Sequence, residues 1–280
     1  MGQANGKVIL AGAGCGDPDL ITVKAAKYLQ QADVVLTDRL VSDDILRNYV
    51  NESTEVVYVG KQCRLGASTP QETINHLLIQ YAEQGKLVVR LKGGDVSIFS
   101  NILDELEVLV ARNIPYEIIP GVTAALGAAA HTGIPLTARG YATAVRLLTY
   151  YKSDVVTDEY WRELSDTNDT LVFYMSSETL PLVVEKLKLY NISNEKKIAV
   201  VEQATTPLQK VHISSFAEYD SILAGKKFLS PSLIIIGRVV ALHEQFAWLQ
   251  NSVSDEYYFR PVAQLNTSSN NKVKQKKERA

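Results

Sequence analysis

Val88-Val89-Arg90-Leu91-Lys92-Gly93-Gly94-Asp95 is the stretch that decides the fold, because an aliphatic strand runs directly into two glycines and a carboxylate. Adjacent glycines lack Cβ atoms, so the backbone can adopt positive φ and a ligand can lie against main-chain N–H and C=O groups. Asp95 adds a carboxylate at the carboxyl end of the strand, which is the edge where open α/β sheets bind ligands. The stretch therefore predicts a strand of a parallel sheet and a loop that holds a polar small molecule.

The first half of the chain alternates strands and helices around this stretch. Short aliphatic runs predict strands at residues 7–11, 33–37, 55–59, 86–91 and 116–119, and helical patterns lie between them at residues 22–31, 42–49, 70–84 and 101–112. Asp17-Pro18 is typical of a helix start, since Asp accepts from open N–H groups and Pro fits the first helical position. This alternation predicts an α/β domain with a parallel sheet.

The second half has a mixed order of elements. Strands are expected at residues 145–149, 171–175, 198–202, 210–213 and 233–237, with helices at 180–189, 215–223 and 239–249 and a hairpin around Thr205-Thr206-Pro207. We therefore expect an α/β protein of two α/β domains, with the site in the cleft between them. The N-terminal domain is expected at residues 1–137, the mixed-sheet C-terminal domain at 138–250 and a disordered basic tail at 251–280.

The composition is that of a globular protein in a reducing compartment. Hydrophobic residues make up 46% and charged residues 21%, and no apolar run approaches the roughly 18 residues of a membrane span. The N-terminus does not read as a signal peptide, and Cys15 and Cys63 fit neither a disulfide framework nor a metal knuckle. The four histidines show no ligand spacing. We expect a cytoplasmic protein without a metal and without membrane attachment.

The charges are unevenly distributed along the chain. Of the 29 basic and 31 acidic residues, five basic residues and one acid lie in residues 261–280, so the rest of the chain is mildly acidic. This distribution argues against nucleic acid as a partner. An anionic substrate would need cations gathered at one place.

Two further features lie at predicted strand ends. Gly12-Ala13-Gly14-Cys15-Gly16-Asp17 follows the first strand and suggests a dinucleotide loop, but Asp17 stands at its third glycine position, where it would crowd and repel a pyrophosphate. The alternative interpretation, a nicotinamide dehydrogenase, is therefore supported by this loop alone. Asp38 and Lys61 follow the second and third strands, so with Asp95 they share one edge of the sheet and indicate a site.

The chain resembles the uroporphyrinogen-III C-methyltransferases of the tetrapyrrole methylase family in a series of segments that span residues 7 to about 245 in the family's order. These segments are Gly12-Ala-Gly-Cys-Gly-Asp17-Pro, Asp38-Arg-Leu-Val-Ser42, Val59-Gly-Lys61, Arg90-Leu-Lys-Gly-Gly-Asp95, Pro120-Gly-Val-Thr-Ala124, Gly133-Ile-Pro-Leu-Thr137, Leu171-Val-Phe-Tyr-Met175 and Ser230-Pro-Ser-Leu-Ile-Ile-Ile-Gly237. The resemblance implies two methyl transfers from S-adenosyl-L-methionine (SAM) to uroporphyrinogen III, which give precorrin-2 for siroheme or cobalamin. It also implies a homodimer with SAM between the two domains.

The resemblance carries specific roles onto this sequence. It implies that Asp38 accepts and Lys61 donates a proton, and that SAM contacts Cys15, Gly93, Gly94, Asp95, Ile98, Thr123, Ala124, Met175 and Ala204. Cys15 stands where the family usually has Pro. Uroporphyrinogen III is a polyanion, so Arg39 and Arg139 are candidates to bind its carboxylates, for which a guanidinium fork is well suited.

The chain also departs from the family's pattern. After Asp95 the usual Pro-Phe-x-Phe-Gly-Arg-Gly-Gly-Glu-Glu is replaced by Val96-Ser-Ile-Phe-Ser-Asn-Ile-Leu-Asp-Glu105, and Ala138 replaces the usual His before Arg139. Ala204 lies in Glu202-Gln-Ala-Thr, where Glu-Asn-Gly-Thr is usual. Two alternatives therefore stay open beside the methyltransferase. They are a divergent paralogue with another substrate or reduced activity, and a non-catalytic protein that binds a tetrapyrrole or SAM.

Overall fold

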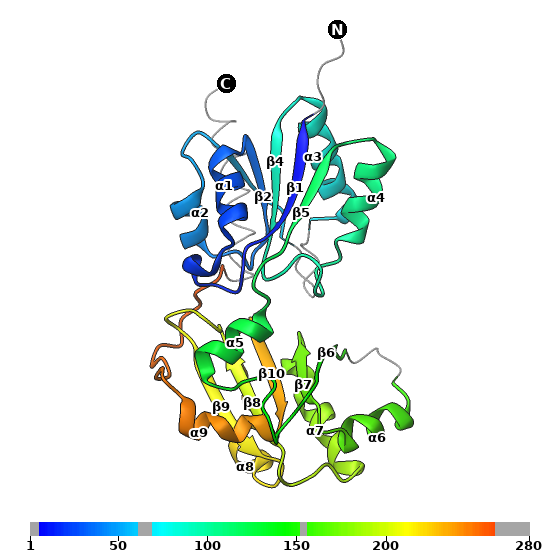
Figure 1. Cartoon of the computed structure of the whole chain (residues 1–280), viewed down its shortest axis with the longest axis vertical. Coiled ribbons are helices and arrows are strands. Elements are labelled where there is room, and N and C mark those ends of the chain that lie inside the picture. The colour runs from blue at the N-terminus through cyan, green and yellow to red at the C-terminus, as the bar shows by residue number, and fades with distance from the viewer. Residues whose placement is uncertain (1–5, 61–68, 152–155, 261–280) are drawn as a thin grey trace, which may run out of the picture. The chain divides into compact units, whose positions relative to one another are not determined.

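A computed structural model describes residues 6–60, 69–151 and 156–260 (Figure 1). The chain forms two compact units. Unit 1 contains the chain up to Thr123 together with the segment from Tyr257 onward, and unit 2 is Ala124–Glu256. The expected boundary at 137/138 differs from this division, because α5 (Ala124–Thr132) packs against a strand of unit 2, β10 (Ser232–Gly237). The C-terminal end also differs from expectation, since residues 257–260 pack on unit 1.

Unit 1 is built on a five-stranded sheet in which every pair is parallel. Its order is β3-β2-β4-β1-β5, with β1 at Lys7–Gly12, β2 at Val34–Thr37, β3 at Glu55–Tyr58, β4 at Leu87–Lys92 and β5 at Tyr116–Ile119. Strand β4 lies between β2 and β1, with Arg90 opposite both Leu36 and Leu10. The loops that follow β2, β4, β1 and β5 are therefore neighbours at one edge.

Helices cover both faces of this sheet. Alternation along β1 sends Ile9 and Ala11 into a core with α1 (Val23–Gln31) and α2 (Asp43–Tyr49). Val8 and Leu10 point into the opposite core with α3 (Gln71–Glu83) and α4 (Leu103–Ala111). Capping residues start two of these helices, since Thr22 Oγ1 accepts from Ala25 N and Ser42 Oγ accepts from Ile45 N. The layers confirm the expected parallel α/β domain.

Unit 2 is built on a mixed five-stranded sheet. Its order is β6-β7-β10-β8-β9, with β6 at Val145–Thr149, β7 at Thr170–Tyr174, β8 at Lys197–Glu202, β9 at Lys210–Ser215 and β10 at Ser232–Gly237. Only β6 and β7 pair in parallel, and β8 and β9 form the expected hairpin. Trp161, Phe173 and Ile234 belong to the core between the sheet, α6 (Asp158–Asp166) and α7 (Leu180–Leu189). The fold class predicted from the sequence is thus confirmed for both units.

Some helices of unit 2 differ from expectation. Strand β9 continues to Ser215, whose hydroxyl accepts from Glu218 N, so α8 is only Tyr219–Ile222. The expected helix at 239–249 is a 3-10 helix, η3 (Arg238–Leu242), followed by the single turn α9 (His243–Phe246). Helix α6, which begins after a Thr157 cap, was not expected. Two further 3-10 turns are η1 (Pro18–Leu20), capped by Asp17 as expected, and η2 (Ser177–Thr179).

No helix in the described part of the chain is both long enough and apolar enough to cross a bilayer.

Candidate functional site

Three glycine-containing loops meet at the carboxyl edge of the unit 1 sheet. Gly14 N donates to Gly94 O at 3.1 Å, and Gly94 N donates to Gly14 O at 2.7 Å. A Cβ on Gly12 would lie 2.6 Å from Gly94 O, and one on Gly121 would lie 2.3 Å from the same oxygen. Such distances are too short for any side chain. We call Gly12, Gly14, Gly94 and Gly121 the glycine junction, in which the loops after β1, β4 and β5 touch backbone to backbone.

Asp95 ties two of these loops together. Its Oδ1 accepts from the Ser97 N–H and the Ser97 hydroxyl, both at 2.8 Å, and its Oδ2 accepts from Gly121 N at 2.9 Å. Burial alone would raise the pKa of Asp95, but these hydrogen bonds outweigh it and hold that pKa below its ordinary value. Asp95 therefore fixes the loop geometry as a buried carboxylate.

The two glycines before Asp95 have different surroundings. A Cβ on Gly93 would lie 2.7 Å from Leu40 Cβ, so Gly93 lets the loop after β2 pack closely. Gly94 has φ +71°, and within the described ranges no atom lies within 4 Å of where its Cβ would be. Gly94 thus combines a conformation that L side chains rarely adopt with open space beside the backbone, which suits a bound molecule.

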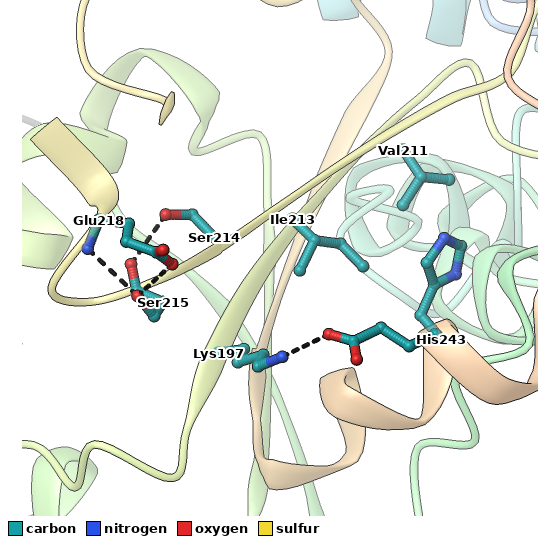
Figure 2. Close-up of a pocket in the computed structure, with 8 residues that line it drawn as sticks. Lys197, Val211, Ile213, Ser214, Ser215, Glu218 and His243 are labelled. Atoms are coloured by element: carbon teal, nitrogen blue, oxygen red, sulfur yellow. Dashed lines mark hydrogen bonds and ion pairs between the residues drawn. The ribbon is translucent and has the colours of Figure 1, made fainter. Parts of the chain in front are cut away.

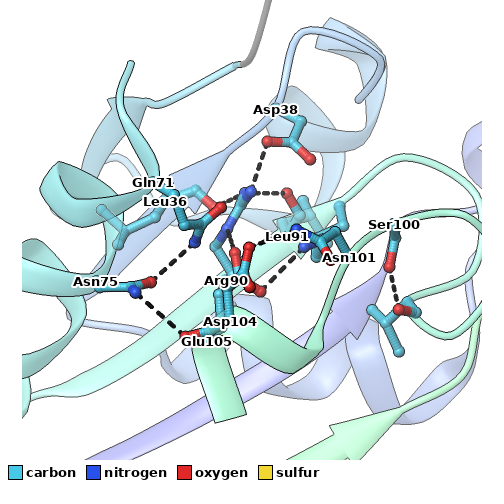
Figure 3. A network of polar contacts seen from close by, with 12 residues as sticks. Leu36, Asp38, Gln71, Asn75, Arg90, Leu91, Ser100, Asn101, Asp104 and Glu105 are labelled. Carbon is cyan, nitrogen blue, oxygen red and sulfur yellow. Dashed lines mark hydrogen bonds and ion pairs between the residues drawn. The ribbon is translucent and has the colours of Figure 1, made fainter. Parts of the chain in front are cut away.

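Asp38, at the end of β2, belongs to a buried charge network (Figure 3). Arg90 Nη2 donates to Asp38 Oδ1 at 2.7 Å, and Arg90 Nε donates to Glu105 Oε1 at 2.8 Å. Lys92 Nζ donates to the other Glu105 oxygen at 3.0 Å. We call Asp38, Arg90, Lys92 and Glu105 the Arg90 network. Asp38 is its member at the sheet edge, with a side chain 23% exposed against 2% for Arg90 and 0% for Glu105.

Burial and charge act in opposite directions on the cations of this network. Burial would lower the pKa of Arg90, but the neighbouring Asp38 and Glu105 carboxylates outweigh it and raise that pKa. For Lys92, burial dominates over the attraction of Glu105, and its pKa is lowered. Arg90 is therefore a fixed cation that orients the Asp38 carboxylate. Sequence reasoning noted Arg90 only as part of a motif and missed Glu105, although an arginine inside an aliphatic strand is itself a signal of a buried pair.

The other predicted SAM residues of unit 1 lie in the same three loops. Cys15 is buried in the loop after β1, and Ile98 is half-buried in the segment after Asp95. Thr123 ends unit 1 in the loop after β5, and Ala124, the next residue, begins α5 in unit 2. The structure thus brings Cys15, Ile98 and Thr123 to the loops that follow β1, β4 and β5.

The last two predicted SAM residues, Met175 and Ala204, also lie in unit 2. Met175 follows β7 with φ +53°, is 44% exposed, and its Sδ accepts from the Tyr151 hydroxyl at 3.2 Å. Ala204 follows β8 and is buried in a turn. Strands β7 and β8 both run antiparallel to β10, and Leu233 is opposite both Tyr174 and Val201. Met175 and Ala204 therefore lie at one edge of the second sheet.

The charged candidates have different settings. Arg39 is half-buried, and its Nη1 donates to the backbone oxygen of Arg260 at 3.3 Å. Arg139 is exposed in the turn that precedes β6. Lys61 lies outside the described residues. Among the residues that the structure describes, no group of three or more His, Cys, Asp or Glu is placed to hold a metal ion.

A separate hollow of about 330 Å³ lies on unit 2 (Figure 2). It is bordered by the Lys197–Glu244 ion pair at 2.6 Å, by His243 and by Ser214 and Ser215 of β9. None of the predicted site residues lines it. This open hollow brings together no set of groups suited to methyl transfer.

Comparison with known proteins identifies a family. The family model for tetrapyrrole (corrin/porphyrin) methylases matches residues 7–220. A siroheme synthase of Pseudomonas aeruginosa (strain UCBPP-PA14) is 43% identical over 252 residues, which are 90% of this chain and 54% of that protein. A siroheme synthase of Saccharophagus degradans is 43% identical over 246 residues. The chain spans about half the length of these curated relatives.

Solved structures share the fold along nearly their whole length. The uroporphyrin-III C-methyltransferase of Thermus thermophilus has a TM-score of 0.71 and 33% identity, covering 88% of this chain and 98% of that one. A structure of that enzyme complexed with S-adenyl homocysteine has a TM-score of 0.69 and 32% identity, covering 84% and 93%. A cobalt precorrin-4 methyltransferase has a TM-score of 0.74 and 30% identity, covering 84% and 95%.

Proposed function

The chain belongs to the tetrapyrrole (corrin/porphyrin) methylase family, and from this premise we propose that it is a SAM-dependent C-methyltransferase that methylates uroporphyrinogen III twice to give precorrin-2. The observation that carries the proposal is the likeness to a uroporphyrin-III C-methyltransferase along 98% of that protein. Relatives named siroheme synthase support a role in making siroheme. The nicotinamide dehydrogenase alternative has no comparable support.

The glycine junction fits a bound SAM. Gly94 borders open space, Cys15, Ile98 and Thr123 lie in the surrounding loops, and Ala124 begins α5. We propose that these residues, with Gly93 and Asp95 and with Met175 and Ala204 of unit 2, hold the donor. SAM supplies an electrophilic methyl group on a sulfonium. The acceptor is an electron-rich carbon, so the protein needs no nucleophile and acts by holding the two reactants in line.

Asp38 is the proposed proton acceptor. The macrocycle must lose a proton after methylation, and a carboxylate within reach can take it. The Arg90–Asp38 contact at 2.7 Å supports this role, because a carboxylate held by a buried guanidinium keeps one orientation. Lys61 remains the proposed proton donor.

The substrate's carboxylates call for local cations. Arg39 lies next to Asp38 in sequence, and we propose that it binds one propionate or acetate arm, with Arg139 of unit 2 as a second candidate. Assembly as a homodimer and a place in siroheme or cobalamin synthesis belong to the same proposal.

The test is an assay with uroporphyrinogen III and isotopically labelled SAM, read by mass spectrometry of the tetrapyrrole. A product with two labelled methyl groups is expected. Tight SAM binding with no transfer to any tetrapyrrole would instead identify a non-catalytic binding protein.

A divergent methylase is the second candidate. It is favoured by the likeness to a cobalt precorrin-4 methyltransferase and by the altered segment 96–105, where Phe99 and Asn101 have φ +51° and +53° without glycine. Faster transfer to a later, already methylated corrin precursor than to uroporphyrinogen III would favour this candidate.

A further inference from the structure

The chain returns to unit 1 after Glu256 and packs on the first turn of α2. The Tyr258 hydroxyl donates to Asp44 Oδ2 at 2.5 Å. Arg260 Nε donates to both oxygens of Asp43, at 2.9 and 3.2 Å. We call Tyr258, Phe259 and Arg260 the C-terminal clasp. Two acidic side chains at the start of a short helix thus hold a segment more than 200 residues away in sequence.

Aromatic contacts and burial strengthen this attachment. The Arg260 guanidinium lies 3.8 Å from the centre of the ring of Tyr58, the last residue of β3, and Phe259 is 3% exposed. Burial and the hydrogen bond to Asp44 raise the pKa of Tyr258 to about 12, so its hydroxyl stays a donor at neutral pH. The clasp is therefore an ordered part of unit 1 although its sequence predicts a tail.

The clasp reaches the loop that carries Asp38. The backbone oxygen of Arg260 accepts from Arg39 Nη1 at 3.3 Å. From the other side, Gly60 and Gly93 confine this loop, since Cβ atoms there would lie 2.9 Å from Arg39 N and 2.7 Å from Leu40 Cβ. The backbone of Arg39 is thus fixed by close packing, and the far end of its side chain by the clasp.

We propose that the C-terminal clasp positions the Arg39 guanidinium to bind a carboxylate of the tetrapyrrole, an inference that rests on the proposed function. A guanidinium has five N–H donors, so one can engage the Arg260 carbonyl while others face a carboxylate. Holding a long side chain in place before the substrate arrives reduces the entropy lost on binding. Tyr258 and Arg260 are accordingly positioning residues that act through Arg39.

The first test compares Arg260→Ala and Tyr258→Phe with the wild-type protein. We expect the KM for uroporphyrinogen III to rise about tenfold for Arg260→Ala and less for Tyr258→Phe. The kcat and the SAM affinity should stay within about twofold of wild type, because the lost interaction binds the substrate equally in the ground state and the transition state. A chain that stops after Val262 keeps the clasp and serves as the control, with kinetics like the wild type. A chain that stops after Glu256 should behave like Arg260→Ala.

A double-variant cycle separates positioning from general stability. If the clasp acts through Arg39, Arg260→Ala should add nothing to the KM increase of Arg39→Ala. Additive KM increases, an unchanged KM in Arg260→Ala, or equal losses of SAM affinity and substrate affinity would each overturn the inference.

A second readout needs no turnover. Phenylglyoxal modification of Arg39, followed by peptide mass spectrometry, should be faster in Arg260→Ala than in the wild type. If the wild-type protein fails to methylate uroporphyrinogen III, the proposed function fails, and this rate alone then decides whether the clasp holds Arg39. An unchanged rate would refute the clasp itself.

Discussion

Asp95, a predicted ligand contact, also holds two loops together through its hydrogen bonds. One oxygen accepts from Ser97 in its own loop, and the other accepts from Gly121 in the loop after β5. The sequence predicted the carboxylate and its place at the strand end. It could not predict Gly121 as a partner, because Gly121 lies in the loop after β5 and is brought near only by the order of the sheet.

This bonding gives a pH-dependent prediction for Asp95→Asn. The pKa of Asp95 is lower in the folded protein than its ordinary value of 3.8, so the unfolded state binds the proton more tightly. The stabilisation from Asp95 is therefore fully present above that value and is lost as the pH falls through the lowered pKa. Urea unfolding should show Asp95→Asn destabilised at pH 7, with a gap to wild type that narrows below pH 4. A pH-independent gap would contradict the assignment.

For Asp38→Asn we expect slower turnover with SAM binding retained. Asn keeps an oxygen for Arg90 but cannot accept the proton, and loss of a general base typically slows a reaction by about 10²-fold or more. The measurement is kcat with uroporphyrinogen III beside SAM affinity by calorimetry. Asp220→Asn, which alters an exposed carboxylate of unit 2, is the control. Turnover at the wild-type rate would exclude Asp38 as the proton acceptor.

Gly94→Val should abolish SAM binding while the protein still folds. The valine side chain would fill the open space beside Gly94, where the donor is proposed to lie. Gly225→Val is a matched control, because Gly225 has φ +75° and a Cβ there also meets no described atom within 4 Å. Both variants carry the same backbone strain, so SAM affinity should fall only in Gly94→Val. Equal affinities would remove Gly94 from the site.

At the scale of elements, the Arg90 network joins three parts of unit 1. Arg90 comes from β4, Glu105 from α4, and Asp38 follows β2 (Figure 3). Lys92 is the last residue of β4. A buried ion pair adds little net stability compared with an apolar pair, but removing one partner leaves a charge uncompensated. The network therefore sets geometry more than it adds stability.

Glu105→Gln should destabilise the protein by about 3 kcal/mol, the lower end for breaking a buried pair. Its amide nitrogen would face Arg90 Nε or Lys92 Nζ, which now donate to the two carboxylate oxygens. Glu107→Gln, on the exposed side of the same helix, should stay within about 0.5 kcal/mol of wild type. Denaturant unfolding measures both. A Glu105→Gln loss as small as the control's would show that the network is dispensable for stability.

Element positions were largely predictable from the sequence, because buried strands are short aliphatic runs and some helices begin after a capping Thr or Ser. The strands of unit 1 lie within a residue or two of their expected bounds. The predictions failed where local contacts override helix propensity, as at Ser215, whose hydroxyl turns the chain after β9. The Arg90 network could not be predicted for a different reason, because Asp38 is distant from Arg90 in sequence and the two come together only through the order of the strands.

At the scale of the whole molecule, charge should govern substrate binding. The net charge is −2, so a polyanionic substrate depends on a few local cations against a mildly acidic background. Salt shortens the screening length from about 10 Å at 0.1 M to about 3 Å at 1 M. We expect the KM for uroporphyrinogen III to rise several-fold over that range, and Arg39→Gln to flatten the rise. A salt-independent KM in the wild type would count against binding through cations.

Two units could be expected from the change in pattern after the first five strands, but the C-terminal clasp could not. Tyr258, Phe259 and Arg260 form neither a strand nor a helix, and a short aromatic and basic stretch before a basic tail carries no periodicity. Their partners Asp43 and Asp44 read simply as favourable first-turn acids of a helix.

The glycine junction also limits how this protein can change over time. Because Gly12 and Gly121 leave no room for even a methyl group, natural variation at those two places is closed off, and drift toward a new ligand must proceed through the surrounding side chains. The glycines beside the proposed SAM site therefore tolerate little substitution. Residues that would contact the methyl acceptor are under no such packing constraint and can be varied more freely.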